Sequence, residues 1–232
     1  MQLSSCNSCA SAGSCSSSGE GGSCEGEQRI PPGMLDHYDT NQSTADGTLV
    51  FIETVIRDAV KQIHPVSAQL LSLATKLKGG RVFGVIFGGI ECKDLYDDIF
   101  SYGVDSLYHI RNDKLRDFHP EAYSEAITSV CERVIPASVL IGSTLKGKEI
   151  APRVAASMGT GIVTECCGLE LNGRKLSMFK TSGDKTIRYE CNSFPQVATV
   201  EEGIFPMPDN IEGRKGTAIY WQYRGEGFKE LL

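Results

Sequence analysis

From residue 49 to residue 171 the chain alternates short apolar runs with segments of helical spacing, and this alternation limits its fold more than any other feature. The apolar runs have the length and composition of buried strands and cover residues 49–54, 81–89, 105–110, 137–142 and 161–171. The helical segments lie between them, at residues 64–80, 92–103, 120–134 and 147–158. Strands connected by helices form right-handed crossover units, so the sequence predicts an α/β fold with a mainly parallel sheet and helices on both faces.

The last third of the chain has a different pattern. Four short runs typical of strands follow one another with Gly, Asp, Asn and Pro between them and no helical segment, at residues 174–181, 185–191, 196–201 and 216–223. We therefore expect antiparallel C-terminal strands, which either extend the parallel sheet as hairpins or form a small flap.

The N-terminal end has the composition of an unfolded segment. Residues 1–33 are dominated by Ser, Gly and Cys and end at Pro31-Pro32-Gly33, and residues 34–48 continue as a polar linker. Such a segment cannot bury enough apolar area to fold alone. The sequence therefore predicts a disordered or metal-binding head, a linker, and one folded domain over residues 49–232.

Four cysteines of the head have the spacing C-x2-C-x5-C-x8-C and are Cys6, Cys9, Cys15 and Cys24. Four thiolates suffice to bind a tetrahedral zinc ion or an iron–sulfur cluster. The spacing matches neither the ferredoxin run nor the paired Cys-x2-Cys of a zinc ribbon. Two hypotheses remain: a metal or cluster carrier, and a disordered tail whose cysteines bind metal only adventitiously.

The formal net charge of −6 is concentrated at the N-terminal end, where residues 1–48 hold six acidic side chains against one arginine. The rest of the chain is nearly neutral and would not attract a phosphate backbone, which argues against nucleic acid as a partner. No apolar run reaches the roughly 18–20 residues needed to span a membrane, and the N-terminus lacks the basic and apolar regions of a secretory signal. We therefore expect a cytoplasmic protein without a membrane span.

A glycine turn follows the fourth apolar run, in the stretch GSTLKGKEIAPR over residues 142–153. In a parallel sheet such a turn lies beyond the carboxyl end of a strand, where unpaired N–H groups and the helix dipole suit an anion, phosphate above all. The candidate binding residues are Gly142, Ser143, Thr144, Gly147, Lys148 and, further along the helix, Arg153. The alternative is a well-capped turn that binds nothing, because neither the nucleotide-triphosphate loop nor the dinucleotide fingerprint is present.

No set of catalytic residues can be recognised from the sequence. The histidines have no second histidine or carboxylate at ligand spacing, and no G-x-S-x-G nucleophile turn occurs. Cys166 and Cys167 are adjacent, but neighbours on a strand point to opposite faces, which argues against a redox pair. The sequence therefore favours a non-catalytic component over an enzyme.

The glycine turn and the segments around it resemble the N-terminal domain of the electron transfer flavoprotein alpha subunit. That family's pattern is a Gly-Ser/Thr turn, a second Gly, Leu/Ile-Ala-Pro-Arg, Thr-Gly and a strand that contains Cys-x-Gly-Leu-Glu. This chain has these elements in order, as Gly142-Ser143-Thr144, Gly147, Ile150-Ala151-Pro152-Arg153, Thr160-Gly161 and residues 164–170. Glu53 and the stretch FPQVATVEEGIFP at residues 194–206 also agree, and the resemblance covers roughly residues 49–215.

The resemblance implies an adenine-nucleotide-hydrolase-like, Rossmann-like fold and a place in an electron-transfer complex. An alpha-like domain would dock with a beta-like subunit and exchange electrons with a dehydrogenase, without catalysing a reaction itself. The family's second domain carries most contacts to FAD, and this chain ends about where that domain would begin. We therefore expect FAD to be at most shared with a partner or with a separate FAD domain. In the related beta subunit the corresponding turn holds AMP, whereas in the alpha subunit it mainly supports the interface, so AMP is the less favoured ligand here.

Two other functions stay open at this point. A stand-alone adenine-nucleotide-binding module would use the turn at residues 142–148, and an iron–sulfur or metal carrier would use the cysteines of the head. Calorimetry with adenine nucleotides tests the first of these, and iron and sulfide analysis tests the second.

Overall fold

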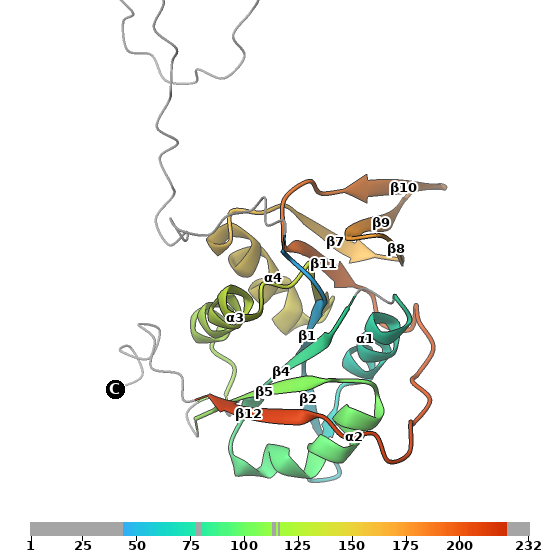
Figure 1. Ribbon diagram of the computed structural model, residues 1–232. Helices are drawn as coiled ribbons and strands as arrows, with labels where there is room; N and C mark the ends of the chain where they lie inside the picture. Colours follow the sequence, from blue (N-terminus) through green and yellow to red (C-terminus); the bar gives the residue numbers. More distant parts are fainter. Residues whose placement is uncertain (1–43, 78–79, 113–114, 116, 222–232) are drawn as a thin grey trace, which may run out of the picture.

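The structure is a computed structural model that describes residues 44–77, 80–112, 115 and 117–221. Its centre is a parallel sheet of seven strands in the order β12-β5-β4-β1-β6-β11-β7 (Figure 1). The strands are β1 (Thr48–Ile52), β4 (Val82–Gly88), β5 (Ser106–Arg111), β6 (Ser138–Gly142), β7 (Ile162–Cys166), β11 (Gln196–Val200) and β12 (Thr217–Trp221). The predicted α/β fold with a mainly parallel sheet is confirmed.

Helices cover both faces of this sheet. They are α1 (Pro65–Lys76), α2 (Tyr96–Ser101), α3 (Pro120–Val134), α4 (Leu145–Ser157) and the 3-10 helix η1 (Ile90–Leu95). Figure 1 shows α3 and α4 on one face and α1 and α2 on the other. Alternate residues of β1 point to opposite layers, so Leu49 and Phe51 pack with α3 and α4, while Val50 and Ile52 pack with α1 and α2. A strand buried on both faces needs a continuous apolar run, which is the pattern that the sequence has.

Local sequence signals set the ends of the helices. Pro65 and Pro120 occupy the first position of α1 and α3, where the missing N–H of proline removes no intrahelical hydrogen bond. Ile135 ends α3 in a left-handed conformation, with φ of 48°. These signals lie close to the boundaries that the sequence predicts.

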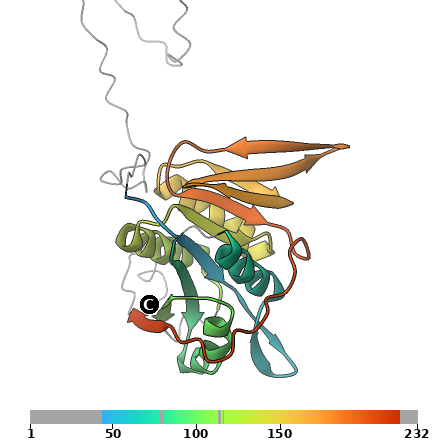
Figure 2. The ribbon, with the colours of Figure 1, turned by 45° about the vertical axis from the view of Figure 1, so that its right-hand side comes forward.

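The C-terminal strands divide between two sheets. β8 (Gly168–Asn172), β9 (Lys175–Ser182) and β10 (Lys185–Glu190) form an antiparallel flap that projects from the body (Figure 2). The predicted flap is therefore present, and the run at residues 161–171 is divided between β7 and β8. β11 and β12 differ from the expectation for their segments, because they join the main sheet in parallel.

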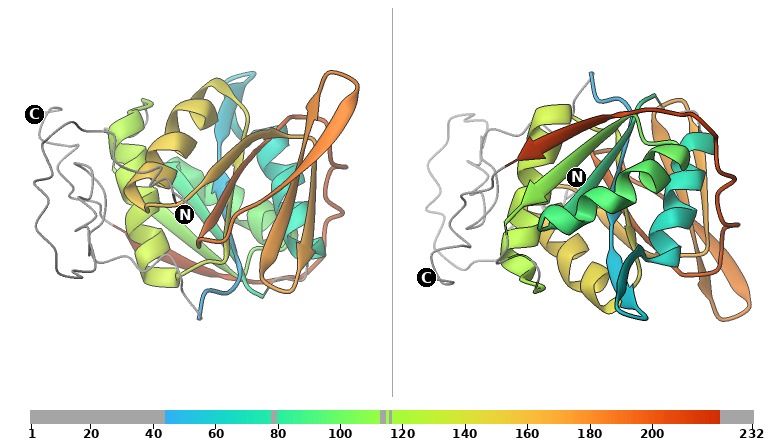
Figure 3. Two further views of the ribbon diagram at one scale, coloured as in Figure 1. Left: turned by 90° about the horizontal axis from the view of Figure 1, so that it is seen from above. Right: turned by 90° about the horizontal axis from the view of Figure 1, so that it is seen from below.

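Two long connections make the parallel pairing of β11 and β12 possible. The flap carries the chain from β7 back to the start of β11, and the loop at residues 201–216 carries it from β11 to β12. This loop passes outside α1 and α2 (Figure 3), where the N–H of Gly203 donates to Gln69 Oε1 and the N–H of Ile211 donates to the carbonyl of Ser101. The direction of a strand thus follows from the path of its connection.

The side chain of Gln196, on β11, connects the flap to the main sheet. It is fully buried, and its Nε2 donates to the carbonyl oxygens of Arg174 at 2.7 Å and Ala137 at 3.3 Å. Its Oε1 accepts a hydrogen bond of 2.7 Å from the N–H of Leu176. One amide thereby satisfies three backbone groups of the flap and of the segment that enters β6.

A short hairpin that the sequence analysis missed follows β1. It consists of β2 (Thr54–Arg57) and β3 (Val60–Ile63), and it extends away from the body (Figure 2). Its turn places Asp58 and Ala59 at positive φ, 51° and 62°. Asn-Gly or Asp-Gly is the usual signal for such a turn, and Ala59 stands where that signal has glycine.

The predicted head lies outside the described residues, and so do its four cysteines, Cys6, Cys9, Cys15 and Cys24. Residues 44–47, at the end of the predicted linker, contact the domain, since Ala45 is fully buried and the N–H of Asp46 donates to the carbonyl of Ile135. Within the part of the chain that is described, no helix has both the length and the apolar composition to cross a membrane. The cytoplasmic location stays a prediction.

Candidate functional site

The glycine turn lies at the carboxyl edge of the main sheet, by which we mean the edge where its seven parallel strands end. β1 and β6 are neighbours at the centre of the sheet; the chain continues from β1 to β4 on one side and reaches β6 on the other. Ligands of open α/β sheets bind at such a reversal of strand order. The predicted turn therefore has the expected position in the fold.

Both glycines of the turn are required by close packing within the protein. A β-carbon on Gly142 would lie 2.5 Å from Cγ1 of Val66 at the start of α1. A β-carbon on Gly147 would lie 1.8 Å from the carbonyl oxygen of Gly142. The glycines thus allow α1, β6 and the first turn of α4 to approach one another, and their presence needs no bound ligand as an explanation.

The hydroxyl groups of the turn also bind inside the protein. Thr144 is the N-cap of α4, because its Oγ1 accepts a hydrogen bond of 3.0 Å from the N–H of Gly147. Ser143 donates from its N–H to the carbonyl of Val200 at 2.7 Å and from its Oγ to Thr199 Oγ1 at 2.9 Å. Ser143 therefore joins the ends of β6 and β11, and Thr144 fixes the beginning of α4.

A buried carboxylate, that of Glu53, faces the turn. Only 7% of the Glu53 surface is exposed. Its Oε2 accepts a hydrogen bond of 2.6 Å from the hydroxyl of Thr144, and its Oε1 lies 3.4 Å from Nζ of Lys146. Glu53 follows β1, so two residues that are 91 positions apart meet at the centre of the carboxyl edge.

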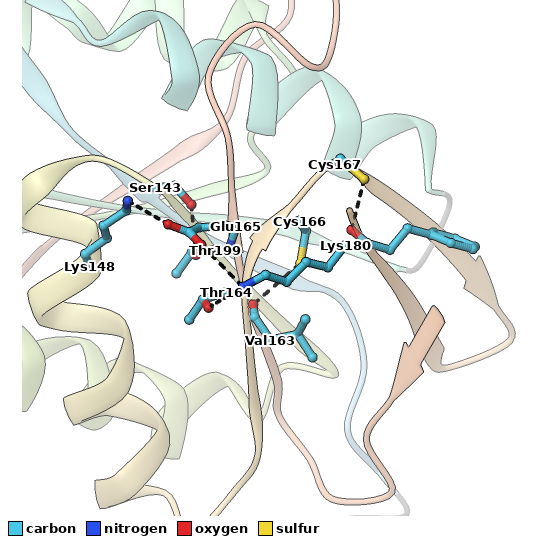
Figure 4. A network of polar contacts seen from close by, with 10 residues as sticks. Ser143, Lys148, Val163, Thr164, Glu165, Cys166, Cys167, Lys180 and Thr199 are labelled. Atoms are coloured by element: carbon cyan, nitrogen blue, oxygen red, sulfur yellow. Dashed lines mark hydrogen bonds and ion pairs between the residues drawn. The ribbon is translucent and has the colours of Figure 1, made fainter. Parts of the chain in front are cut away.

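A second carboxylate, that of Glu165 at the end of β7, binds the next lysines. Figure 4 shows Lys148 of α4 and Lys180 of the flap approaching Glu165 from two sides, at 2.8 Å and 3.3 Å. The ion pairs and hydrogen bonds to Lys148 and then Lys180 lower the pKa of Glu165. Glu165 has a φ of 58° and its N–H donates to Thr199 Oγ1, where the pairing of β7 with β11 shifts register.

The predicted site residues are therefore brought together only in part. Gly142, Ser143, Thr144, Gly147 and Lys148 form one turn. Arg153 lies about two helical turns further along α4, where its Nη2 is 3.0 Å from Oε1 of Glu121 on α3. Glu53 and Glu165 are the residues that sequence reasoning did not connect with the turn. For Glu53 the available signal was an acidic residue directly after an apolar strand, whereas Glu165 lies inside β7.

A groove of about 490 Å³ lies further along the carboxyl edge, between the β2–β3 hairpin and η1. It is lined by Ile56, Ala59, Val60, Lys61, Glu91 and Asp94. Lys61 Nζ is 3.0 Å from Oε1 of Glu91. Burial raises the pKa of Glu91, but hydrogen bonds from backbone N–H groups and from Lys61 outweigh it and lower the pKa to about 2. Lys61 and Glu91, two of the charged residues of the groove, are thus paired with each other.

His109 on β5 is fully buried, and both of its ring nitrogens are engaged. Tyr96 Oη lies 2.6 Å from Nδ1, and the carbonyl oxygen of Gly88 lies 3.2 Å from Nε2. Because a carbonyl can only accept, Nε2 carries the proton and Nδ1 accepts from Tyr96. Burial lowers the pKa of His109, so the ring is neutral at physiological pH.

The cysteines of the domain have the character of packing residues. Cys92, Cys131, Cys166, Cys167 and Cys191 are free thiols. Burial raises the pKa of Cys166 to about 12, which keeps this thiol protonated and unreactive at neutral pH. Among residues 44–77, 80–112, 115 and 117–221 no group of three His, Cys, Asp or Glu side chains could hold a metal ion.

Comparisons with known proteins agree with the geometry. The electron transfer flavoprotein domain matches residues 52–223. The subunit LctC of the lactate dehydrogenase (NAD(+),ferredoxin) of Acetobacterium woodii is 30% identical over 78% of this chain and 45% of its own length. FixB of Azorhizobium caulinodans is 32% identical over 68% of this chain and 45% of its own length. The electron transfer flavoprotein subunit alpha of Thermoanaerobacterium thermosaccharolyticum is 30% identical over 66% of this chain and 48% of its own length.

The chain spans about half the length of these curated relatives. The match over residues 52–223 covers most of the chain and confirms the resemblance that the sequence motifs indicate. This protein belongs to the electron transfer flavoprotein family.

Proposed function

We propose that this domain is a docking component of an electron-transfer flavoprotein complex. It joins a beta-like subunit through the carboxyl edge of its sheet, and the assembly exchanges electrons with a dehydrogenase in the cytoplasm. The domain itself catalyses no reaction. Its relatives include an electron transfer flavoprotein subunit alpha and a subunit of a lactate dehydrogenase, which is the class of partner that the proposal names.

The distribution of exposed apolar side chains carries this proposal. Several large ones stand in segments that leave the carboxyl ends of β4, β1, β6 and β11, which are adjacent in the sheet. They are Ile90 after β4, Ile56 and Val60 after β1, Leu145 after β6, and Ile204 and Met207 after β11. Leu145, at the head of α4, has 87% of its surface exposed. Apolar side chains gathered along one edge are characteristic of a surface that binds another protein.

The polar groups of the turn support the same choice. Thr144 and Lys146 contact Glu53, and Lys148 contacts Glu165, so the groups that would hold a nucleotide phosphate bind carboxylates of the protein itself. This arrangement favours the docking component over a stand-alone adenine-nucleotide-binding module.

FAD is the cofactor that the family implies, and the described residues of this domain do not fit it as sole binding partners. A pyrophosphate needs unengaged backbone or side-chain donors at a helix N-terminus. At the head of α4 the side chains of Thr144 and Lys146 are engaged by Glu53. We therefore propose that FAD is at most shared with a partner or with a separate FAD domain, and we assign no step of its chemistry to these residues.

Reconstitution with a beta-like subunit tests the proposal. The full chain and the subunit, mixed at micromolar concentration, are expected to sediment as a complex in analytical ultracentrifugation. Absorbance near 450 nm, followed in the same run, reports whether flavin travels with the complex. The proposal is overturned if no complex forms, or if the chain alone purifies with flavin held tightly.

A further inference from the structure

The centre of the carboxyl edge holds a carboxylate where ligands of parallel sheets commonly bind. Glu53 follows β1 directly and stands beside the turn that follows β6, at the reversal of strand order. Its carboxylate is largely buried and belongs to the protein. The buried carboxylate is an observation separate from the N-terminus of α4 beside it. It shows that the anion bound at this N-terminus is the side chain of Glu53.

The backbone of Glu53 is fixed by contacts outside the turn. Its N–H donates to Oγ of Ser67 at 2.9 Å, and its carbonyl oxygen accepts from the N–H of His64 at 2.8 Å. Both partners lie at the beginning of α1. The position of the Glu53 side chain is therefore set by α1, and the carboxylate is presented to the turn.

The groups that hold the carboxylate are those that bind phosphate in other proteins. Thr144 supplies a hydroxyl at 2.6 Å and Lys146 supplies an ammonium group at 3.4 Å. The first N–H groups of α4 have no partner inside the helix, and the helix dipole favours an anion there. A carboxylate satisfies this environment with the same sign of charge and the same kind of acceptor atom as a phosphate.

Glu165 completes the neutralisation of the turn. It pairs with Lys148, two residues after Lys146 in the first turn of α4, and with Lys180 of the flap, on the side of α4 where β7 ends. The two carboxylates together engage the lysines Lys146, Lys148 and Lys180. A phosphate that approached the turn would meet cations already bound to anions of the protein.

We propose that Glu53 is a built-in anion in a latent phosphate site and that, with Glu165, it excludes phosphorylated ligands from the carboxyl edge. This inference deepens the proposed docking function and rests on it, since an edge closed to nucleotides stays available to a protein partner. A phosphate could enter only by displacing Glu53 from Thr144 and Lys146, against the repulsion between two negative charges. Glu53 thereby determines which class of ligand the edge accepts.

Removing Glu53 should open the site. Glu53→Ala removes both the charge and the bulk of the side chain, and Glu53→Gln removes the charge alone. Inorganic phosphate and AMP are titrated into each protein, and binding is measured by calorimetry and by the amide signals of residues 144–148 in NMR spectra. We expect no saturation with the wild-type protein, and an affinity at least about tenfold higher for Glu53→Ala, with a smaller gain for Glu53→Gln.

Two further variants serve as controls. Glu121→Ala removes an exposed carboxylate from the first turn of α3, where it pairs with Arg153, and should bind phosphate no better than the wild-type protein. Lys146→Ala added to Glu53→Ala should abolish the gain. Thermal melting shows which variants are folded, and Glu53→Gln decides the question if Glu53→Ala does not fold.

A gain in the Glu53 variants that Glu121→Ala does not share supports the inference. A folded Glu53 variant that binds no better than the wild-type protein overturns it, and so does saturable binding of phosphate by the wild-type protein at residues 144–148. Complex formation with a beta-like subunit is measured without phosphate. The phosphate titrations therefore test this inference, and complex formation tests the docking function, so that either one can fail without the other.

Discussion

The first turn of α4 rests against the end of β6 so closely that a β-carbon on Gly147 would lie 1.8 Å from the carbonyl oxygen of Gly142. The same approach brings the hydroxyl of Thr144 within 2.6 Å of Glu53 Oε2. The sequence analysis proposes Gly147 as part of a phosphate site. The packing of α4 on β6 is sufficient to explain why this position is a glycine. This packing also places Lys146 next to the buried carboxylate.

Substitution of Gly147 should destabilise the domain. The side chain of Gly147→Ala would meet backbone atoms, so α4 must shift, and we expect a loss of about 1–3 kcal/mol in the free energy of unfolding. Urea denaturation followed by circular dichroism measures this loss. Gly168→Ala is the matched control, because its β-carbon would lie no closer than 3.5 Å to its neighbours, and it should change stability by less than about 0.5 kcal/mol. Equal stability of the two variants would show that the close approach is not needed.

Gln196→Leu should loosen the flap and the sheet together. Leucine cannot replace the hydrogen bonds to Ala137, Arg174 and Leu176, and each buried backbone group left without a partner costs about 1–3 kcal/mol. The carbonyl of Ala137 keeps a hydrogen bond from the N–H of residue 196, so two groups lose their partner, and we expect a total loss of about 2–6 kcal/mol by urea denaturation. Gln62→Leu, at an exposed position of β3, provides the control. A loss no greater than that of the control would mean that Gln196 does not hold the flap.

The pH dependence of stability should report His109. Burial lowers its pKa in the folded protein below the ordinary value of 6.5. The unfolded chain therefore takes up the proton first, so this contribution to stability is complete above pH 6.5 and is lost as the pH falls below it.

His109→Gln keeps an N–H donor for the carbonyl of Gly88 but has no group that titrates in this range. Urea midpoints at about pH 7 and about pH 5 should differ less for this variant than for the wild-type protein. An identical pH dependence of the two proteins would exclude His109 as the source.

Leu145→Asp should weaken binding to a beta-like subunit without unfolding the domain. Leu145 is 87% exposed, and an acidic residue is favourable in the first turn of a helix. In a complex, however, the carboxylate would have to lose its water at an apolar surface, so we expect affinity to fall about tenfold or more. Ile187→Asp on β10 is the control, at an exposed apolar position of the flap. Titration calorimetry that finds the two variants equally weakened would place the interface elsewhere.

The sequence predicts the layers of this fold better than it predicts the directions of the last strands. β1, β4 and β6 are buried on both faces, and their continuous apolar runs are recognisable without any knowledge of neighbours. The direction of β11 and β12 depends on the flap and on the loop at residues 201–216, whose paths follow from tertiary contacts.

The candidate site shows the same limit. The glycine turn is a local signal and lies where the sequence predicts it. The contact between Thr144 and Glu53 joins residues 91 positions apart, and the contact between Lys148 and Glu165 depends on a register shift beside β11. Such pairs become visible only when the strands have been placed next to each other.

The most direct test of whether the carboxyl edge binds another protein is amide hydrogen exchange. It is measured for the chain alone and for the chain saturated with a beta-like subunit. The segments that leave β1, β4, β6 and β11 should become protected on binding, at residues 54–63, 89–95, 143–148 and 201–208. Protection confined to the flap at residues 168–190, or no protection anywhere in the domain, would contradict this role of the carboxyl edge.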